Sequence, residues 1–251
     1  MSVAIFDTET TDRKDGEIIE AAWMLLPVVN DLMGSSDRIS ETFNHPIISQ
    51  RFRPSKPMSY GAIAVHHILP SELEDCPPSS TFKLPDDVTM IVGHSVDFDW
   101  AAAGSPPRVK RICTHAMAQH VFPEAGGYSL VALIYYCMGA TEVARELVRD
   151  AHGAYTDVRL CSILLQFILD KKPEIKTWSA LWDLSEECRI PRTCPMKKYE
   201  GVLLEDLDDG FIRWCLNQDW LDPYLRIGLD RVMAKRYPET RDELDDEDTP
   251  W

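Results

Sequence analysis

The chain has 251 residues, of which 45% are hydrophobic, enough for one large domain or for one domain with a small module. Its formal net charge of −15 argues against a broad, non-specific grip on duplex DNA, because such binding depends on many basic contacts to phosphates. The seven cysteines are scattered and include no Cys-x-x-Cys pair, which disfavours a disulfide framework and a zinc cluster. We therefore expect a cytoplasmic protein with no signal peptide and no membrane span.

The first predicted strand, Val3–Phe6, is a short apolar run that leads directly to Asp7 and Glu9. Residues i and i+2 of an extended chain point to the same face, so both carboxylates can serve one metal site. The alternative for this pair is a solvated turn after the strand. Two further strands, Ile18–Leu26 and Ile48–Arg53, predict an antiparallel start to the sheet.

The middle of the chain repeats the pattern of a strand followed by an acid. After a helix at Ser59–His66 and a Pro- and Ser-rich loop over 70–87, a buried strand is expected at Met90–Gly93. A helix at Phe98–Ala103 would then carry Asp99 in its first turn. Both Asp97 and Asp99 could be carboxylates favoured by the helix dipole; we assign that role to Asp97 and a metal-ligand role to Asp99.

A third acidic motif follows a strand at Val109–Cys113 and helices at His115–Phe122 and Ser129–Met138. Asp157 opens an apolar-periodic helix that ends near residue 171, and His152 lies on the loop before it. A loop histidine with the ordinary pKa of ~6.5 suits proton abstraction near neutral pH, although a lone histidine is more often a surface or core residue. The other histidines are assigned mainly to such structural roles: His45, His66, His67, His94, His115 and His120.

The three motifs, at 6–10, 93–99 and 152–157, together resemble those of the DEDDh branch of the DnaQ-like 3′→5′ exonucleases. The resemblance covers about residues 1–172 well and continues weakly to about 238. It implies an α/β, RNase H-like exonuclease fold, in which a mixed central sheet is flanked by helices. It also implies two Mg²⁺ or Mn²⁺ ions held by four ligands, with His152 as the general base: Asp7, which bridges both ions, Glu9, Asp99 and Asp157.

The same resemblance indicates residues that contact the substrate. These are Thr8, Thr10, His66 and Phe98, although His66 could equally cap its helix. Candidate phosphate contacts, each of which could also be ordinary surface, are Arg51, Arg53, Lys56, Arg108, Lys110 and Arg111. Two positions depart from the family pattern: Ser95 stands where many members have Asn, and Asp12 where Gly is usual.

Beyond the exonuclease domain at 1–172, we predict a small, mostly helical C-terminal module at 173–238 and a disordered acidic tail at 239–251. A segment that starts at Cys194 resembles a module at the C-terminus of some relatives, with Met196 and Lys197 in place of Phe-Gly. Its expected core is Leu203, Leu207, Phe211, Trp214 and Leu225. Its aromatic residues, with Lys197, Lys198 and Arg213, could bind a single strand, or the module could simply be a packed accessory domain.

The predicted function is metal-dependent 3′→5′ hydrolysis of DNA ends, which releases nucleoside 5′-monophosphates. Two alternatives remain at this point. An RNA 3′→5′ exonuclease of the RNase T or oligoribonuclease kind would differ in its contacts near the sugar 2′-OH. A recruitment protein would act through the C-terminal module and the tail; Trp251 resembles the aromatic end of bacterial single-stranded-DNA-binding proteins and could bind a protein partner, or the tail could be merely solvated.

Overall fold

The structure is a computed structural model that describes residues 2–27 and 45–238. The predicted tail at 239–251, with Trp251, lies outside the described residues. The chain divides into two compact units, Met1–Cys188 and Arg189–Trp251.

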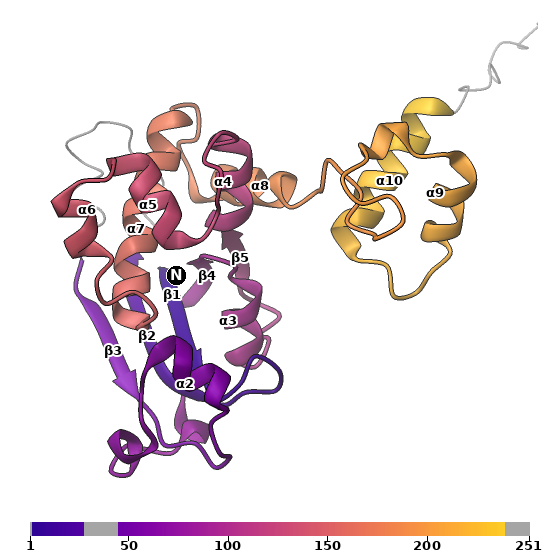
Figure 1. Ribbon diagram of the computed structural model, residues 1–251. Helices are drawn as coiled ribbons and strands as arrows, with labels where there is room; N and C mark the ends of the chain where they lie inside the picture. The colour runs from indigo at the N-terminus through magenta and orange to yellow at the C-terminus, as the bar shows by residue number, and fades with distance from the viewer. Residues whose placement is uncertain (1, 28–44, 239–251) are drawn as a thin grey trace, which may run out of the picture. The chain divides into compact units, whose positions relative to one another are not determined.

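The first unit is built on a mixed five-stranded sheet (Figure 1). Its order is β3-β2-β1-β4-β5, where β1 pairs antiparallel with β2 and parallel with β4. The sheet confirms the predicted antiparallel start and the strands expected downstream. The strands are β1 (Ser2–Thr10), β2 (Ile18–Pro27), β3 (Ile47–Arg51), β4 (Val88–Gly93) and β5 (Lys110–Cys113).

The central strand β1 is longer than its apolar run predicts. It continues through Thr10, because its backbone stays paired with β2 beyond Phe6, with a register shift between Glu9 and Thr10. Asp7 and Glu9 therefore lie within the strand rather than in a turn after it. An extended backbone keeps the two side chains on one face of the sheet.

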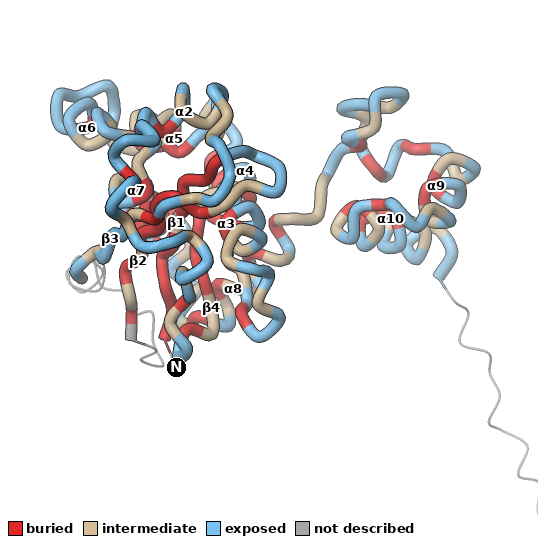
Figure 2. The backbone as a smooth tube through the Cα atoms, turned by 90° about the horizontal axis from the view of Figure 1, so that it is seen from below, coloured by how far each residue is buried: buried red, intermediate tan, exposed pale blue. Residues whose placement is uncertain are grey.

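Helices cover the sheet, and Figure 2 shows the buried residues gathered along the strands and the inner faces of these helices. The longest, α7 (Ala154–Lys171), packs against β1 and β2 through a stripe that includes Val158, Leu165 and Ile168. It begins at Ala154, slightly before the predicted start at Asp157. The short helix α6 (Glu142–Leu147) was not predicted. The other helices of this unit are α2 (Tyr60–His66), α3 (Asp97–Ala102), α4 (Thr114–Val121), α5 (Leu130–Met138), α6 (Glu142–Leu147) and α8 (Trp178–Cys188).

The division between the units falls after Cys188, later than the predicted boundary at 172/173. Pro173 follows the end of α7 but does not end the unit, because α8 packs on α4 and β5. Trp178 and Leu181 of α8 are buried in the first core, and the Ser185 hydroxyl accepts a hydrogen bond of 2.8 Å from the Cys113 N–H. The separation of activities between the two units stays a prediction.

The second unit is small and mostly helical, with a short 3-10 turn at Leu204–Asp206 followed by α9 (Asp209–Leu216) and α10 (Pro223–Arg236). Leu207 and Leu225 are in its core as predicted, and Phe211 packs against it. Leu203 and Trp214 are not, because 43% and 49% of these residues are exposed. The buried set is Cys194, Leu204, Leu207, Ile212, Cys215, Leu221, Leu225 and Leu229. Within the described ranges, none of the helices in either unit has the length and apolarity of a membrane span.

Candidate active site

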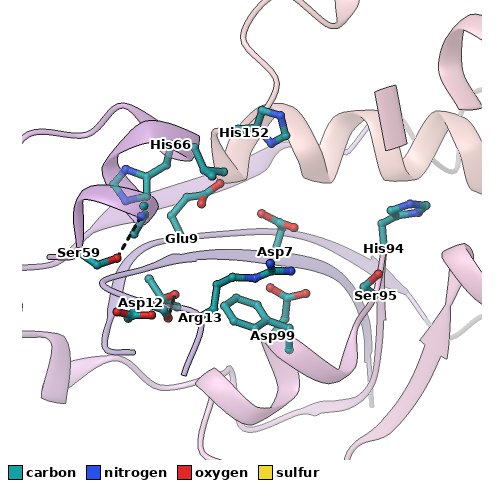
Figure 3. A pocket seen from close by; sticks show the side chains of 15 residues that line it. Asp7, Glu9, Asp12, Arg13, Ser59, His66, His94, Ser95, Asp99 and His152 are labelled. Atoms are coloured by element: carbon teal, nitrogen blue, oxygen red, sulfur yellow. Dashed lines mark hydrogen bonds between the residues drawn. The ribbon is translucent and has the colours of Figure 1, made fainter. Parts of the chain in front are cut away.

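Four carboxylates from three distant segments meet beside the central strand. Asp7 and Glu9 come from β1, Asp99 from α3 and Asp157 from the first turn of α7. Asp7, Glu9 and Asp157 each place one oxygen within 4.8 Å of the others. Figure 3 shows Asp99 on the adjacent helix, with its carboxylate toward Asp7. The structure thus brings together the four acids that the sequence motifs single out.

Asp99 is held in place by Thr8. The backbone N–H of Thr8 donates to Asp99 Oδ1 at 2.9 Å, and the Thr8 hydroxyl donates to the same oxygen at 2.8 Å. All of these groups are buried. Thr8, predicted to bind substrate, is instead engaged with Asp99 and is not among the residues that line the adjacent cavity.

Without a cation, burial and mutual repulsion disfavour the ionised form of these carboxylates. Burial raises the pKa of Glu9 to about 9, with Asp157 and Glu20 contributing, and raises the pKa of Asp99 to about 7. Burial, followed by the charges of Asp99 and Asp157, holds the pKa of Asp7 well above its usual range. Hard divalent cations prefer carboxylate oxygen ligands, so this donor set fits Mg²⁺ or Mn²⁺ and would be neutralised by it.

His152 lies at the rim of the cluster, on the loop that enters α7 (Figure 3). It is exposed, and its backbone is left-handed with φ of 70°, a conformation that costs energy for a residue other than glycine. The backbone N–H of His152 donates to Asp157 Oδ1 at 3.3 Å. Asp157 therefore combines two tasks: it contributes an oxygen to the acidic cluster and restrains the loop that carries His152.

The cluster opens into a cavity of about 740 Å³. Of the predicted substrate contacts, Thr10, His66 and Phe98 line it. Three residues of α2 border the cavity: Ala62, Val65 and His66. Ser59 caps this helix, because its hydroxyl accepts from the Ala62 N–H. The full lining is Asp7, Glu9, Thr10, Asp12, Arg13, Ser59, Gly61, Ala62, Val65, His66, His94, Ser95, Phe98, Asp99 and His152.

His66 is buried at this wall, and one of its ring nitrogens has no hydrogen-bond partner among the described residues. Its Nδ1 accepts a hydrogen bond of 2.9 Å from the N–H of Ile68, whereas Nε2 has no hydrogen-bond partner among the described residues. Burial lowers the pKa of the imidazole, so the neutral ring carries its proton on Nε2. The left-handed cap of α2 is His67 rather than His66. His66 thus borders the cavity and holds a buried Nε2 donor that no described residue satisfies.

Sequence reasoning missed the basic residue that borders this cavity, Arg13. It lies on the loop between β1 and β2, immediately after the first motif, and Figure 3 shows its side chain in front of Asp7 and Asp99. None of the six predicted phosphate contacts lines the cavity. Arg51 pairs with Glu20 and Glu72, for example, and Arg111 pairs with Asp97 at 2.6 Å. Position in the loop, rather than charge alone, was the signal that could have found Arg13.

Glu20 of β2 is a further carboxylate that the motifs did not indicate. It is buried and lies opposite Glu9 in the antiparallel register. Its Oε2 accepts from the Ala154 N–H at 3.0 Å and its Oε1 from Arg51 Nε at 3.2 Å. Glu20 therefore links β2 to the start of α7, next to His152.

The structure describes both positions that depart from the resembled pattern, Ser95 and Asp12. Ser95 adopts a left-handed backbone with φ of 70°, a conformation that Asn tolerates better than Ser. At Asp12, the backbone lies close to Gly16, since a Cβ at Gly16 would come within 2.2 Å of the Asp12 carbonyl oxygen. His94 also borders the cavity, but its Nε2 contacts the Tyr128 carbonyl at 2.8 Å and its Nδ1 the Thr114 hydroxyl at 3.1 Å. With both ring nitrogens engaged, His94 has a structural role.

The fold is RNase H-like, and the chain is similar to known exonucleases, as the DnaQ-like resemblance of its motifs predicts. The chain is 28% identical over 232 residues to exodeoxyribonuclease 10 of Escherichia coli K12, an alignment that covers 90% of this chain and 96% of that protein. No family model matches the present chain.

Two solved structures share the fold. Exonuclease X in complex with 5′ overhanging duplex DNA is 22% identical, with a TM-score of 0.53, and the match covers 73% of this chain and 99% of that one. E. coli exonuclease I in complex with a dA16 oligonucleotide is 17% identical, with a TM-score of 0.50, and the match covers 72% and 42%. Their likeness supports the architecture around the acidic cluster.

Proposed function

We propose that this protein is a divalent-metal-dependent 3′→5′ exodeoxyribonuclease that releases nucleoside 5′-monophosphates from DNA ends. The observation that carries the proposal is the partly buried cluster of Asp7, Glu9 and Asp157, whose oxygens lie within 4.8 Å of one another beside Asp99 and His152. The name of the curated relative, exodeoxyribonuclease 10, supports DNA as the substrate.

Asp7, Glu9, Asp99 and Asp157 would hold two Mg²⁺ or Mn²⁺ ions. Such ions, when bound, make water a stronger nucleophile and stabilise charge on the leaving oxygen. The four side chains themselves fix where the scissile phosphate can lie. Thr8 keeps Asp99 in position through its two hydrogen bonds.

His152 acts as the general base in this proposal, taking a proton from the attacking water onto its ring. Its exposed place on a loop lets the ring reach the water and then return the proton to solvent. The hydrogen bond to Asp157 restrains this loop. Arg13 places positive charge beside the phosphate, and His66 contacts the terminal nucleotide from the cavity wall.

The proposal is tested with matched DNA and RNA oligonucleotides labelled at the 5′ end, in Mg²⁺ and in chelator. We expect a ladder that shortens from the 3′ end of DNA and disappears with chelator or with His152→Ala. His120→Ala, which changes a histidine outside the cavity, is the control and should retain the ladder. A ladder on RNA alone would contradict the assignment of DNA as the substrate. The absence of a ladder on both polymers would contradict the proposal that the protein is an exonuclease.

A further inference from the structure

The second unit carries a row of aromatic side chains, which we call the aromatic face: Tyr199, Phe211, Trp214 and Trp220. We propose that this face binds single-stranded DNA. The choice of DNA rests on the proposed exonuclease function, whereas the case for a binding face rests on the arrangement of the rings and the charges around them.

The four rings form a continuous series. The centroids of Tyr199 and Phe211 lie 4.3 Å apart, and those of Phe211 and Trp214 lie 5.9 Å apart with only 23° between the ring planes. Trp214 and Trp220 follow at 6.0 Å. Rings spaced in this way offer successive planar surfaces on which nucleobases can stack.

The two tryptophans are not needed to fill the core of the unit. Trp214 is 49% exposed and Trp220 is 62% exposed, and neither packs into the cluster formed around Ile212, Cys215 and Leu225. Large exposed aromatic side chains grouped together are typical of a binding surface rather than of random surface composition. Tyr199 and Phe211 are half-buried, which anchors the row to the core.

The charges around the rings favour an anionic ligand. Lys198 Nζ lies 4.8 Å from the centroid of Tyr199 and 6.0 Å from that of Phe211, and the neighbouring Lys197 is exposed. The guanidinium of Arg213 lies instead over the ring of Tyr237, 5.7 Å from its centroid. The nearby acid Asp208 is engaged, since it accepts hydrogen bonds from the Tyr199 hydroxyl and the Phe211 N–H.

The charge balance of the unit also favours an anionic ligand. Residues 189–238 hold nine lysines and arginines against eight aspartates and glutamates, a charge of +1, within a chain of net charge −15. Exposed Glu200 and Asp219 limit the strength of this field. The stacking surface must therefore supply much of the affinity.

A single strand satisfies both features together. Its bases are free to stack on the rings while its phosphates meet Lys197 and Lys198. A duplex hides the faces of its bases, and an acidic peptide would use the cations without the rings. The proposal therefore predicts a preference for single strands over both of these ligands.

The test measures binding of a fluorescein-labelled oligothymidylate to the full chain by fluorescence polarisation, in chelator so that the strand is not degraded. Loss of one stacked base contact lowers affinity by about 1–3 kcal/mol, so we expect Trp214→Ala with Trp220→Ala to raise Kd at least about tenfold. The matched double phenylalanine variant keeps both rings and should remain within a few-fold of the parent. Ile227→Ala, which removes a 41% exposed apolar side chain elsewhere in the unit, should leave Kd unchanged.

An unchanged Kd in the double alanine variant, or equally tight binding of a duplex or of an acidic peptide, would overturn the proposal. Thermal melting of each variant separates a lost contact from a misfolded unit. Nuclease activity on a dinucleotide separates this proposal from the proposed function. A protein without nuclease activity that binds through the tryptophans would refute only the exonuclease, whereas an active enzyme with tryptophan-independent binding would refute only the aromatic face.

Discussion

Glu20 accepts a hydrogen bond of 3.0 Å from the backbone N–H of Ala154, the first residue of α7. The contact joins a buried strand to the helix whose first turn carries Asp157 and whose preceding loop carries His152. Arg51 holds the other oxygen of Glu20, so the carboxylate is fixed from both sides. The orientation of the loop thus depends on a residue outside the three sequence motifs.

Replacing Glu20 by alanine should lower both stability and turnover. The buried Ala154 N–H would lose its acceptor, at a cost of about 1–3 kcal/mol, and the loop of His152 would lose a restraint. We expect a lower Tm and a fall in kcat with little change in KM. Glu20→Gln retains an acceptor oxygen and should recover part of kcat, whereas equal losses in both variants would contradict a positioning role. Glu72→Ala, which removes a 41% exposed partner of Arg51 together with the acceptor of the Leu69 N–H, should lower Tm less than Glu20→Ala does.

Thr8 provides a second test of how the site is held. Thr8→Val removes the hydroxyl that donates to Asp99 at 2.8 Å while keeping the shape of the side chain. A hydrogen bond to a charged group contributes about 1.5–3 kcal/mol, so kcat/KM should fall roughly 10- to 100-fold and the affinity for Mn²⁺ should weaken. Thr8→Ser keeps the hydroxyl and serves as the control. Kinetics of the valine variant that match the parent would show that the backbone N–H alone positions Asp99.

The metal-free protein should become less stable as pH rises. The pKa of Glu9 is raised from an ordinary value of 4.5 to about 9 in the fold, so its protonated form is favoured there. Folding stability is therefore highest below about pH 4.5 with respect to this group and is lost as pH rises toward 9. Tm measured in chelator should fall over pH 5–9, and saturating Mg²⁺ should reduce or reverse the fall.

Substitutions within the acidic cluster provide the control for this pH dependence. Glu9→Gln and Asp7→Asn remove one of the repelling charges, so both should raise Tm in chelator at pH 8 while weakening the response to Mg²⁺. A Tm that is independent of pH in chelator, in the parent and in both variants, would be incompatible with a strained acidic cluster.

Arg13 should act on substrate binding rather than on the chemical step. It borders the cavity, whereas Arg53 lies outside it and donates to the Glu74 carbonyl. Arg13→Ala should raise KM for DNA several-fold, by a factor that shrinks at high salt because the contact is electrostatic. Arg53→Ala is the matched control and should leave KM unchanged. The reverse pattern would return the phosphate contact to the surface predicted from sequence.

Much of this site could be predicted because its residues follow local patterns. Asp7 and Glu9 share a face through the two-residue period of a strand, and Asp157 stands where an apolar helical period begins. Those periods depend only on neighbouring residues. The motif order then indicated that the segments meet, and the structure brings them together.

The remaining features depend on contacts between distant segments. Glu20 is an unremarkable acid in sequence, and its role arises only because β2 lies beside the start of α7. The late boundary at Cys188 likewise reflects the packing of α8 on β5, which no linker composition announces. Trp214 was expected in the core because of its hydrophobicity, whereas its place on α9 exposes it.

The measurement that tests the central claim most directly compares Asp7→Ala and His152→Ala for Mn²⁺ binding by calorimetry and for single-turnover cleavage of 5′-labelled single-stranded DNA. Asp7 belongs to the ligand cluster, so its variant should lose both metal binding and cleavage. His152 stands outside that cluster, so its variant should bind Mn²⁺ like the parent while its cleavage rate falls by about 10²–10⁴-fold. Equal loss of metal binding in the two variants, or cleavage at the parent rate by His152→Ala, would contradict the roles assigned here.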